Sequence, residues 1–144
     1  MDYRILNARD FGLPQNRKRM FIVAMDKAKG GFGNFKFPSP IPLTYTLSDI
    51  VGGKCEREFS RTLICAGRGI KLTRPPNKWG CDVIVKDGMP YRLSVRENLR
   101  LQGFPEDFVP HKARSHALRQ VGNAVPPPMI YALVKPILTV RIPT

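Results

Sequence analysis

Three polar side chains near the N-terminus are spaced so that they could act together on one ligand. Residues 14–19 read Pro-Gln-Asn-Arg-Lys-Arg, and in an extended segment alternate side chains share a face. Gln15, Arg17 and Arg19 would therefore project to the same side. Two guanidinium groups on one side form a strong oxygen-binding site. The alternative that the residues leave open is a solvated strand edge protected by charge.

A second block, residues 94–105, carries the signals of a short helix. Ser94 and Glu97 have capping-box spacing, in which the hydroxyl accepts from the backbone at Glu97 and the carboxylate reaches back to the cap. Gly103 followed by Pro105 supplies the stop. The sequence predicts a helix over about 95–102, with Glu97 and Arg100 at a salt-bridging spacing.

A third block, Gly122-Asn123-Ala124-Val125, lies before a run of three prolines. It could end one helix and turn into the next, with Gly122 in a left-handed conformation and Asn123 as a cap. Beyond the prolines, apolar residues recur at helical spacing over 129–138. This stripe predicts a C-terminal helix that packs against a large surface.

Short elements must position these blocks. Apolar runs over 3–8 and 20–25 predict two strands joined by a loop. Residues 30–42 are rich in Gly and Pro with interleaved phenylalanines, which indicates a linker with aromatic contacts. Over 47–90, short β-forming runs interrupted by Gly-Arg-Gly and Pro-Pro predict a small twisted β structure with long loops.

Size and charge restrict the function classes. The chain has 144 residues and 42% hydrophobic content, enough for one domain with a core. Lys and Arg number 24 against 11 Asp and Glu, giving a net charge of +13. Such a balance suits a polyanion such as nucleic acid, DNA or RNA alike. The alternative is a basic protein that is merely soluble.

Other chemistry is not indicated. Cys55, Cys65 and Cys81 form no Cys-x-x-Cys pair, so the sequence predicts neither a disulfide framework nor a zinc ribbon. His111 and His116 have no cysteine between them, and we expect no metal site there. No apolar run approaches the roughly 18–20 residues of a membrane span, and no signal-peptide pattern opens the chain. A reducing cytosol and no membrane partner are expected.

Taken together and in order, the blocks at 14–19, 96–105 and 122–126 resemble the last three motif blocks of the DNA (cytosine-5) methyltransferases. Each block alone is of moderate specificity, whereas the ordered conjunction is highly specific. The resemblance covers roughly the two ends of the chain. The middle corresponds only in position, where family members place their variable target-recognition region.

The resemblance implies roles for five residues. Arg17 and Arg19 would help hold a flipped-out cytosine and the DNA backbone, with Gln15 in support. Asn123 and Ala124 would lie beside the cofactor S-adenosylmethionine. The helix that follows them would pack against the parallel sheet of the family's N-terminal half.

The resemblance implies a scaffolding role for Arg96, Glu97, Arg100 and Gly103, which would organise the recognition domain. In the middle of the chain, Thr62-Leu63 followed by a Gly-rich loop is similar to a recurring piece of the recognition region, in which the threonine touches a phosphate. Basic residues nearby are natural readers of backbone or bases. The predicted DNA-binding residues are Arg61, Thr62, Arg68, Lys71, Arg74 and Lys78.

The chain also departs from the family pattern. None of its three cysteines follows a proline, so no residue fits the family's Pro-Cys nucleophile. The Gly-rich segment 30–33 follows the arginine block without the strand and helix of a cofactor loop. We therefore expect the C-terminal half of a methyltransferase, whose partners are double-stranded DNA and the missing N-terminal half, and which is inactive alone.

The sequence thus predicts a mixed α/β fold. Residues 1–27 and 115–144 would be strand and helix pieces of a catalytic domain dependent on S-adenosylmethionine, and residues 28–114 a small, loop-rich β target-recognition domain. The expected setting is restriction-modification in a bacterial or phage cytoplasm, at the nucleoid. The alternative of another class is a non-enzymatic basic module that binds nucleic acid, which explains the charge and leaves the three ordered blocks to coincidence.

Overall fold

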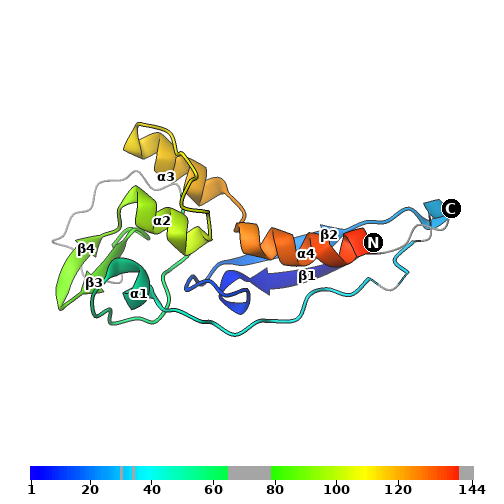
Figure 1. The fold of residues 1–144 in the computed structure, drawn as a ribbon, viewed down its shortest axis with the longest axis horizontal. Coiled ribbons are helices and arrows are strands. Elements are labelled where there is room, and N and C mark those ends of the chain that lie inside the picture. Colours follow the sequence, from blue (N-terminus) through cyan, green and yellow to red (C-terminus); the bar gives the residue numbers. More distant parts are fainter. Residues whose placement is uncertain (30, 34, 65–78, 140–144) are drawn as a thin grey trace.

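The computed structural model describes residues 1–29, 31–33, 35–64 and 79–139 (Figure 1). In chain order the elements are β1 (Asp2–Asn7), η1 (Ala8–Asp10), β2 (Lys18–Val23), η2 (Lys27–Lys29), α1 (Leu47–Val51), β3 (Val83–Lys86), β4 (Met89–Arg92), α2 (Val95–Gln102), α3 (Arg114–Asn123) and α4 (Pro127–Thr139). The strands form two separate antiparallel hairpins, β1–β2 and β3–β4. The predicted small, mixed α/β composition is confirmed.

The β1–β2 hairpin and α4 make up one end of the molecule (Figure 1). Both strands were predicted, and each begins and ends one or two residues earlier than the apolar runs indicated. The side of the hairpin that carries Leu6 and Val23 packs with Met129 and Leu133 of α4. The buried residues of this first core are Leu6, Ala8, Phe11, Leu13, Val23, Phe37, Met129 and Leu133.

The linker predicted over residues 30–42 packs against the first core. Phe37 is buried in it, and Phe32 and Phe35 pack against it. The ring centroid of Phe35 lies 5.2 Å from that of Phe37 in an edge arrangement, and the Arg4 guanidinium lies over the Phe37 ring at 5.2 Å. The aromatic contacts expected from this Gly/Pro-rich segment are thus present.

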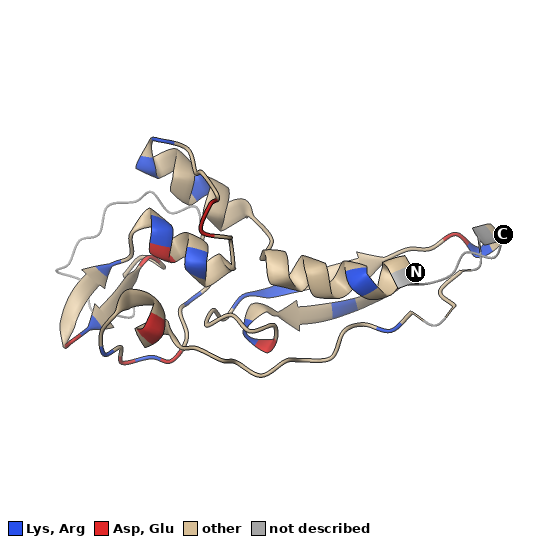
Figure 2. Cartoon of the chain, viewed as in Figure 1, with Lys and Arg blue, Asp and Glu red and all other residues tan. Residues whose placement is uncertain are grey.

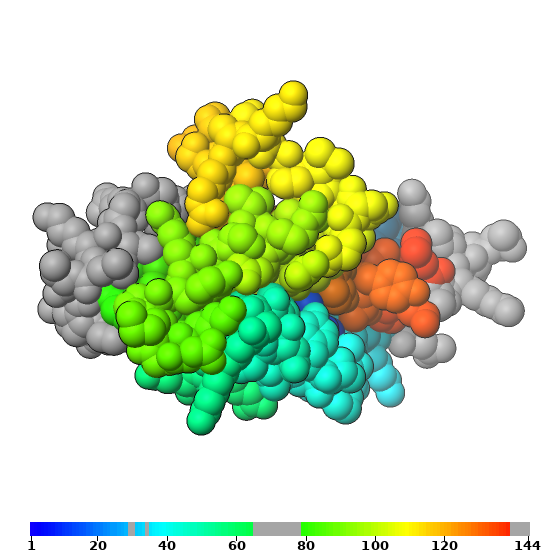
Figure 3. Space-filling model, turned by 60° about the vertical axis from the view of Figure 1, so that its left-hand side comes forward, coloured from blue at the N-terminus to red at the C-terminus, as the bar shows by residue number. Residues whose placement is uncertain are grey.

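The other end of the molecule contains α1, the β3–β4 hairpin, α2 and α3. Asp87 and Gly88 join β3 to β4 with φ of 51° and 76°, as a two-residue hairpin turn requires. In Figure 3, α2 and β3–β4 in green lie directly against the teal segment that contains α1. The buried residues of this second core are Leu47, Val51, Leu63, Leu93, Leu99, Leu101 and Val121.

The predicted helix over 95–102 is confirmed as α2, together with its caps. The Ser94 hydroxyl accepts from the Glu97 backbone at 3.1 Å, and the Glu97 carboxylate accepts from the Ser94 backbone at 2.6 Å. Gly103 ends the helix with φ of 77°. A Cβ there would lie 2.7 Å from Pro128 and 2.9 Å from Leu13. Gly103 therefore also permits the close packing of α2 on the start of α4.

Two expectations about local structure were wrong. Residues 47–51 form the helix α1, because Thr46 and Asp49 make a capping box in which the Asp49 carboxylate accepts from the Thr46 backbone at 2.6 Å. Gly122 is not left-handed: α3 continues through it to Asn123, and the chain leaves the helix at Ala124 in an extended conformation. Because Val121 belongs to the second core and α4 packs in the first, the extended backbone at Ala124 connects the two cores.

Candidate functional site

Gln15 is fully buried and lies at the point where the first block meets α2. Its side-chain Nε2 donates to the Leu101 carbonyl and to Gln102 Oε1, each at 2.9 Å. Its Oε1 accepts from the Leu63 backbone at 3.4 Å. A buried amide is stabilised only when its donors and acceptor are satisfied. Gln15 therefore joins α2 to Leu63, which follows the predicted DNA-binding residue Thr62.

Arg17 is buried just as deeply, with 1% of its surface exposed. Nη1 donates to the Leu63 carbonyl at 2.6 Å, and Nη2 donates to the carbonyls of Gly122 and Ala124, both at 2.8 Å. A buried charge is costly unless it is hydrogen-bonded, and the guanidinium fork can reach carbonyls in different directions. Arg17 thus fastens the end of α3 to Leu63.

Gln102, the last residue of α2, completes this arrangement. It is fully buried, and its Nε2 donates to the Val121 carbonyl at 2.7 Å. We call Gln15, Arg17 and Gln102 the polar junction. The junction brings together the three sequence blocks, which are far apart along the chain. Sequence reasoning assigned no role to Gln102, although its place directly before Gly103 within the second block was a usable signal.

Arg19 differs from the other two residues of its block. It is half-buried on β2, and its Nη1 donates to the neighbouring Lys18 carbonyl at 2.8 Å. By strand alternation its side chain lies on the same side of β2 as Phe21 and Val23. Gln15 and Arg17 are therefore buried, whereas solvent reaches Arg19.

The predicted cofactor-proximal residues are the last residue of α3, Asn123, and the residue that follows it, Ala124. Asn123 is exposed at the end of α3, and Ala124 is half-buried. The Ala124 carbonyl accepts a hydrogen bond from the buried Arg17 guanidinium. The buried Arg17 thus fixes the backbone of this turn, and Asn123 is exposed to solvent.

The segment 60–62, which contains the predicted DNA-binding residues Arg61 and Thr62, runs beside the first block. Backbone bonds join Ser60 to Pro14 at 2.8 Å and Asn16 to Ser60 at 3.0 Å. The Thr62 hydroxyl donates to the Asn16 carbonyl at 2.6 Å, so its proton is used within the chain. Arg61 Nη1 donates to the Trp79 carbonyl at 3.4 Å. Four predicted DNA-binding residues lie outside the described part of the chain: Arg68, Lys71, Arg74 and Lys78.

The second block makes the contacts of a scaffold, with one difference from expectation. Glu97 and Arg100 do not form the predicted pair. The Glu97 carboxylate accepts from Ser94 and from the Tyr91 hydroxyl at 2.9 Å. Arg100 donates twice to the Glu106 carboxylate, at 2.7 and 3.1 Å. This pairing lowers the pKa of Glu106 and raises that of Arg100. Arg100 therefore pairs with Glu106 of the loop after α2, and not with Glu97 as predicted.

Arg96 also contacts this loop, because its Nη1 donates to the carbonyls of Glu106 and Phe108 at 3.0 and 3.2 Å. The loop is therefore held by two arginines of α2.

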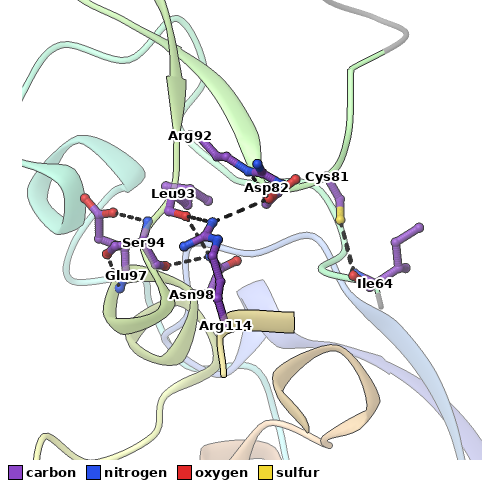
Figure 4. A network of polar contacts seen from close by, with 9 residues as sticks. All are labelled: Ile64, Cys81, Asp82, Arg92, Leu93, Ser94, Glu97, Asn98 and Arg114. Carbon is purple, nitrogen blue, oxygen red and sulfur yellow. Dashed lines mark hydrogen bonds and ion pairs between the residues drawn. The ribbon is translucent and has the colours of Figure 1, made fainter. Parts of the chain in front are cut away.

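A second polar network links the β3–β4 hairpin to α3 (Figure 4). The Asp82 carboxylate is buried and pairs with Arg92 at 2.9 Å and with Arg114 at 3.8 Å. Arg114 also donates to the Leu93 carbonyl at 2.8 Å. Sequence reasoning missed this network. The available signal was an acidic residue at the start of an apolar strand in a strongly basic chain.

The two described cysteines, Cys55 and Cys81, are free thiols of intermediate burial. Cys81 Sγ accepts from the Ile64 backbone at 3.3 Å and lies 3.6 Å from the Ile64 carbonyl (Figure 4). Burial raises the pKa of the Cys81 thiol and of the Cys55 thiol. The thiolate is the form of cysteine that acts as a nucleophile, and burial disfavours it at both positions.

Two further findings concern the described residues. They contain no group of His, Cys, Asp and Glu that could hold a metal ion. None of their helices is long and apolar enough to cross a membrane. His111 and His116, stacked with ring centroids 4.7 Å apart, are thus not part of such a metal-binding group.

Comparison with known proteins identifies similar chains. The type II methyltransferase M.SsoII of Shigella sonnei is 30% identical over 95% of this chain and 44% of its own length. M1.ScrFI of Lactococcus lactis subsp. cremoris is 30% identical over 97% of this chain and 44% of its length. M.MthTI of Methanothermobacter thermautotrophicus is 31% identical over 95% and 56%. The chain spans about half the length of these curated relatives.

A family model also matches most of the chain. The model describes the C-5 cytosine-specific DNA methylases, and it matches residues 1–67 and 60–139. These ranges include all three blocks and the polar junction that they form. The chain therefore belongs to the family of C-5 cytosine-specific DNA methylases.

Proposed function

We propose that this chain is the C-terminal, target-recognition part of a DNA (cytosine-5) methyltransferase. The observation that carries the proposal is the polar junction, in which Gln15, Arg17 and Gln102 fasten the three family-like blocks to one another. Base chemistry requires the cytosine to leave the helical stack. A rigid junction between the recognition segment and the cofactor-proximal turn would hold both in register around the extruded base.

Within this proposal the residues of the first block have different tasks. Gln15 and Arg17 are positioning residues, because their polar groups bind Leu63, the end of α2 and the end of α3. Arg19 is the residue that would contact the flipped cytosine, since it is half-exposed and its one described bond is to a neighbouring carbonyl. We therefore propose that Arg19 contacts the base and that Arg17 does not.

S-adenosylmethionine would supply the methyl group. Asn123 presents an amide and Ala124 a methyl group at a turn supported by Arg17. These groups fit one wall of a cofactor site and do not enclose it. We propose that the remaining walls, and the cysteine that attacks the pyrimidine ring, belong to the part of the methyltransferase beyond this chain. The isolated chain would then transfer no methyl group.

Duplex DNA is the proposed substrate and partner. Lys and Arg positions, blue in Figure 2, occur in α2, α3, α4 and the strands, and the net charge is +13. We propose that Arg61, Thr62, Arg68, Lys71, Arg74 and Lys78 contact DNA. Family membership does not favour the alternative of a non-enzymatic module. Because the relatives are named type II methyltransferases, we propose a role in restriction-modification.

The test compares Arg19→Ala with Arg68→Ala in the complete enzyme. Arg19→Ala should raise the activation barrier of single-turnover methylation by roughly 2–4 kcal/mol, as for other preorganised donors, and change duplex affinity much less. Arg68→Ala should weaken duplex binding and largely retain turnover once DNA is saturating. If Arg19→Ala lowers binding and turnover equally, or lowers neither, Arg19 does not contact the reacting base.

A further inference from the structure

A buried carboxylate holds two arginines together where β4 meets the start of α3 (Figure 4). Asp82 precedes β3, Arg92 ends β4 and Arg114 begins α3. Both guanidinium groups approach the same atom, Asp82 Oδ2, at 2.9 and 3.8 Å. The Asp82 side chain is 6% exposed, whereas each arginine side chain is 42% exposed. The carboxylate is thus inside the protein, and both arginines remain accessible to solvent.

Much of the hydrogen-bonding capacity of these two arginines is unused. Within the described part of the chain, Arg92 donates hydrogen bonds only through Nε, and Arg114 only through Nη2. A guanidinium carries several N–H donors in a planar fork, so most of each fork stays available to a ligand. Two guanidinium groups beside one carboxylate also leave a net positive charge. The pair can therefore bind an anion that has several acceptor oxygens.

Arg100 shows how an arginine is paired in this chain when the contact is structural. Its side chain is 45% exposed, and it donates twice to the Glu106 carboxylate, so the two charges cancel. Asp82 is instead shared by two arginines, and its buried Oδ1 accepts no hydrogen bond from the described residues. A buried carboxylate that is incompletely hydrogen-bonded is costly. Stability alone therefore does not account for the arrangement around Asp82.

The pair is connected to the proposed recognition segment. Cys81, directly before Asp82, accepts from the Ile64 backbone at 3.3 Å (Figure 4). Ile64 lies two residues after Thr62, a proposed DNA contact. The polyanion that the proposed function brings to this part of the fold is duplex DNA.

We propose that Arg92 and Arg114 together bind one phosphate of the DNA backbone, and that Asp82 is the residue that positions them; this inference rests on the proposed function. The planar forks of two arginines match phosphate oxygens. Because Asp82 orders both side chains before DNA arrives, less side-chain entropy is lost on binding. Phosphate contacts orient a protein on the duplex and carry no sequence information, so this contact acts on any sequence.

The test measures binding of the chain to a short mixed-sequence DNA duplex by fluorescence anisotropy over a series of salt concentrations. Arg92→Ala and Arg114→Ala should each weaken binding at least about fivefold, as expected for loss of a charge-assisted bond. The double variant should reduce the salt slope by about 0.9, because one phosphate is released, whereas two separate phosphates would reduce it by about 1.8. The matched control is Arg100→Ala, since Glu106 already cancels the charge of Arg100. It should change the affinity less than about twofold.

Asp82→Asn separates positioning from charge. The substitution removes a negative charge, so electrostatic attraction alone would tighten binding to DNA. Loss of the shared anchor should instead weaken it. Arg92→Lys keeps the charge without the fork, and it should also weaken binding. Circular dichroism and urea midpoints identify any unfolded variant, and the half-exposed Arg92→Lys carries the test if Asp82→Asn does not fold.

Three results would overturn the phosphate site: wild-type affinity in both single alanine variants, a slope reduced by about 1.8 in the double variant, or tighter binding by folded Asp82→Asn. Failure of the proposed function gives a different result, because the wild-type chain would then bind no duplex even at low salt, and the phosphate site would fail with it. Wild-type binding that the arginine variants leave unchanged refutes the phosphate site alone.

Discussion

Replacement of Arg17 is the sharpest test of the polar junction. In Arg17→Ala, the buried carbonyls of Leu63 and Gly122 lose their charged donor, and the part-buried carbonyl of Ala124 keeps only the 3.4 Å bond from Gln102. Each unsatisfied buried acceptor costs about 1–3 kcal/mol. Because removal also ends the desolvation cost of the guanidinium, and water can enter the vacated space, the costs do not simply add. We expect the free energy of unfolding to fall by about 3–5 kcal/mol.

The free energy of unfolding of a domain is only about 5–15 kcal/mol, so the Arg17→Ala variant could be unfolded. The milder Arg17→Lys variant therefore gives a second measure of the loss of stability. An ammonium group offers its donors from one point and does not span from Leu63 to Gly122. At least one carbonyl is left unpaired, which corresponds to a loss of about 1–3 kcal/mol. Arg19→Ala is the control, because the residue is half-exposed and bonds to a neighbouring carbonyl. It should lower the free energy of unfolding by less than about 1 kcal/mol.

The assay is urea denaturation followed by circular dichroism, with equal m-values required for the comparison. The order expected for the loss of stability is Arg17→Ala, then Arg17→Lys, then Arg19→Ala. If both Arg17 variants unfold at the wild-type midpoint, the guanidinium does not hold the blocks together, and the positioning role is refuted.

Three other predictions follow from named features. Gly103→Ala should lower the free energy of unfolding by about 2–4 kcal/mol, because it adds both left-handed backbone strain and overpacking. Gly88→Ala should lower it by about 1–2 kcal/mol, because Gly88 has a φ of 76° but nothing within 4 Å of an added Cβ. Equal losses would contradict the packing argument. Since burial raises the pKa of the Cys81 thiol, the folded chain at pH 8 should contain less Cys81 thiolate than the urea-unfolded chain. Iodoacetamide should therefore modify Cys81 more slowly in the folded chain, as measured by peptide mass spectrometry. Equal rates would show that the thiol is not shielded. The purified chain should bind duplex DNA with log K falling by about 0.9 per neutralised phosphate against log salt, and salt-independent binding would count against an electrostatic interface.

Local signals were sufficient for several elements. The Ser94–Glu97 capping box and Gly103 lie within one short stretch, so they define α2 without knowledge of the rest of the chain. The strands β1 and β2 were likewise predicted from short apolar runs, and the helix α4 from helical apolar spacing. The helix α1 could have been predicted in the same way, because Thr46 and Asp49 have the spacing of its capping box.

The sequence by itself determined which blocks the chain contains, and it predicted that alternate residues of the first block share a face. It did not determine what covers that face. Alternation treats Gln15, Arg17 and Arg19 as equivalent, whereas the packing of α2 and α3 buries the first two and leaves the third accessible. Likewise, Asp82 meets Arg114 across 32 residues only because the tertiary fold brings the residue before β3 close to the start of α3. Burial and long-range pairing depend on which surfaces meet, and that is decided by the tertiary structure.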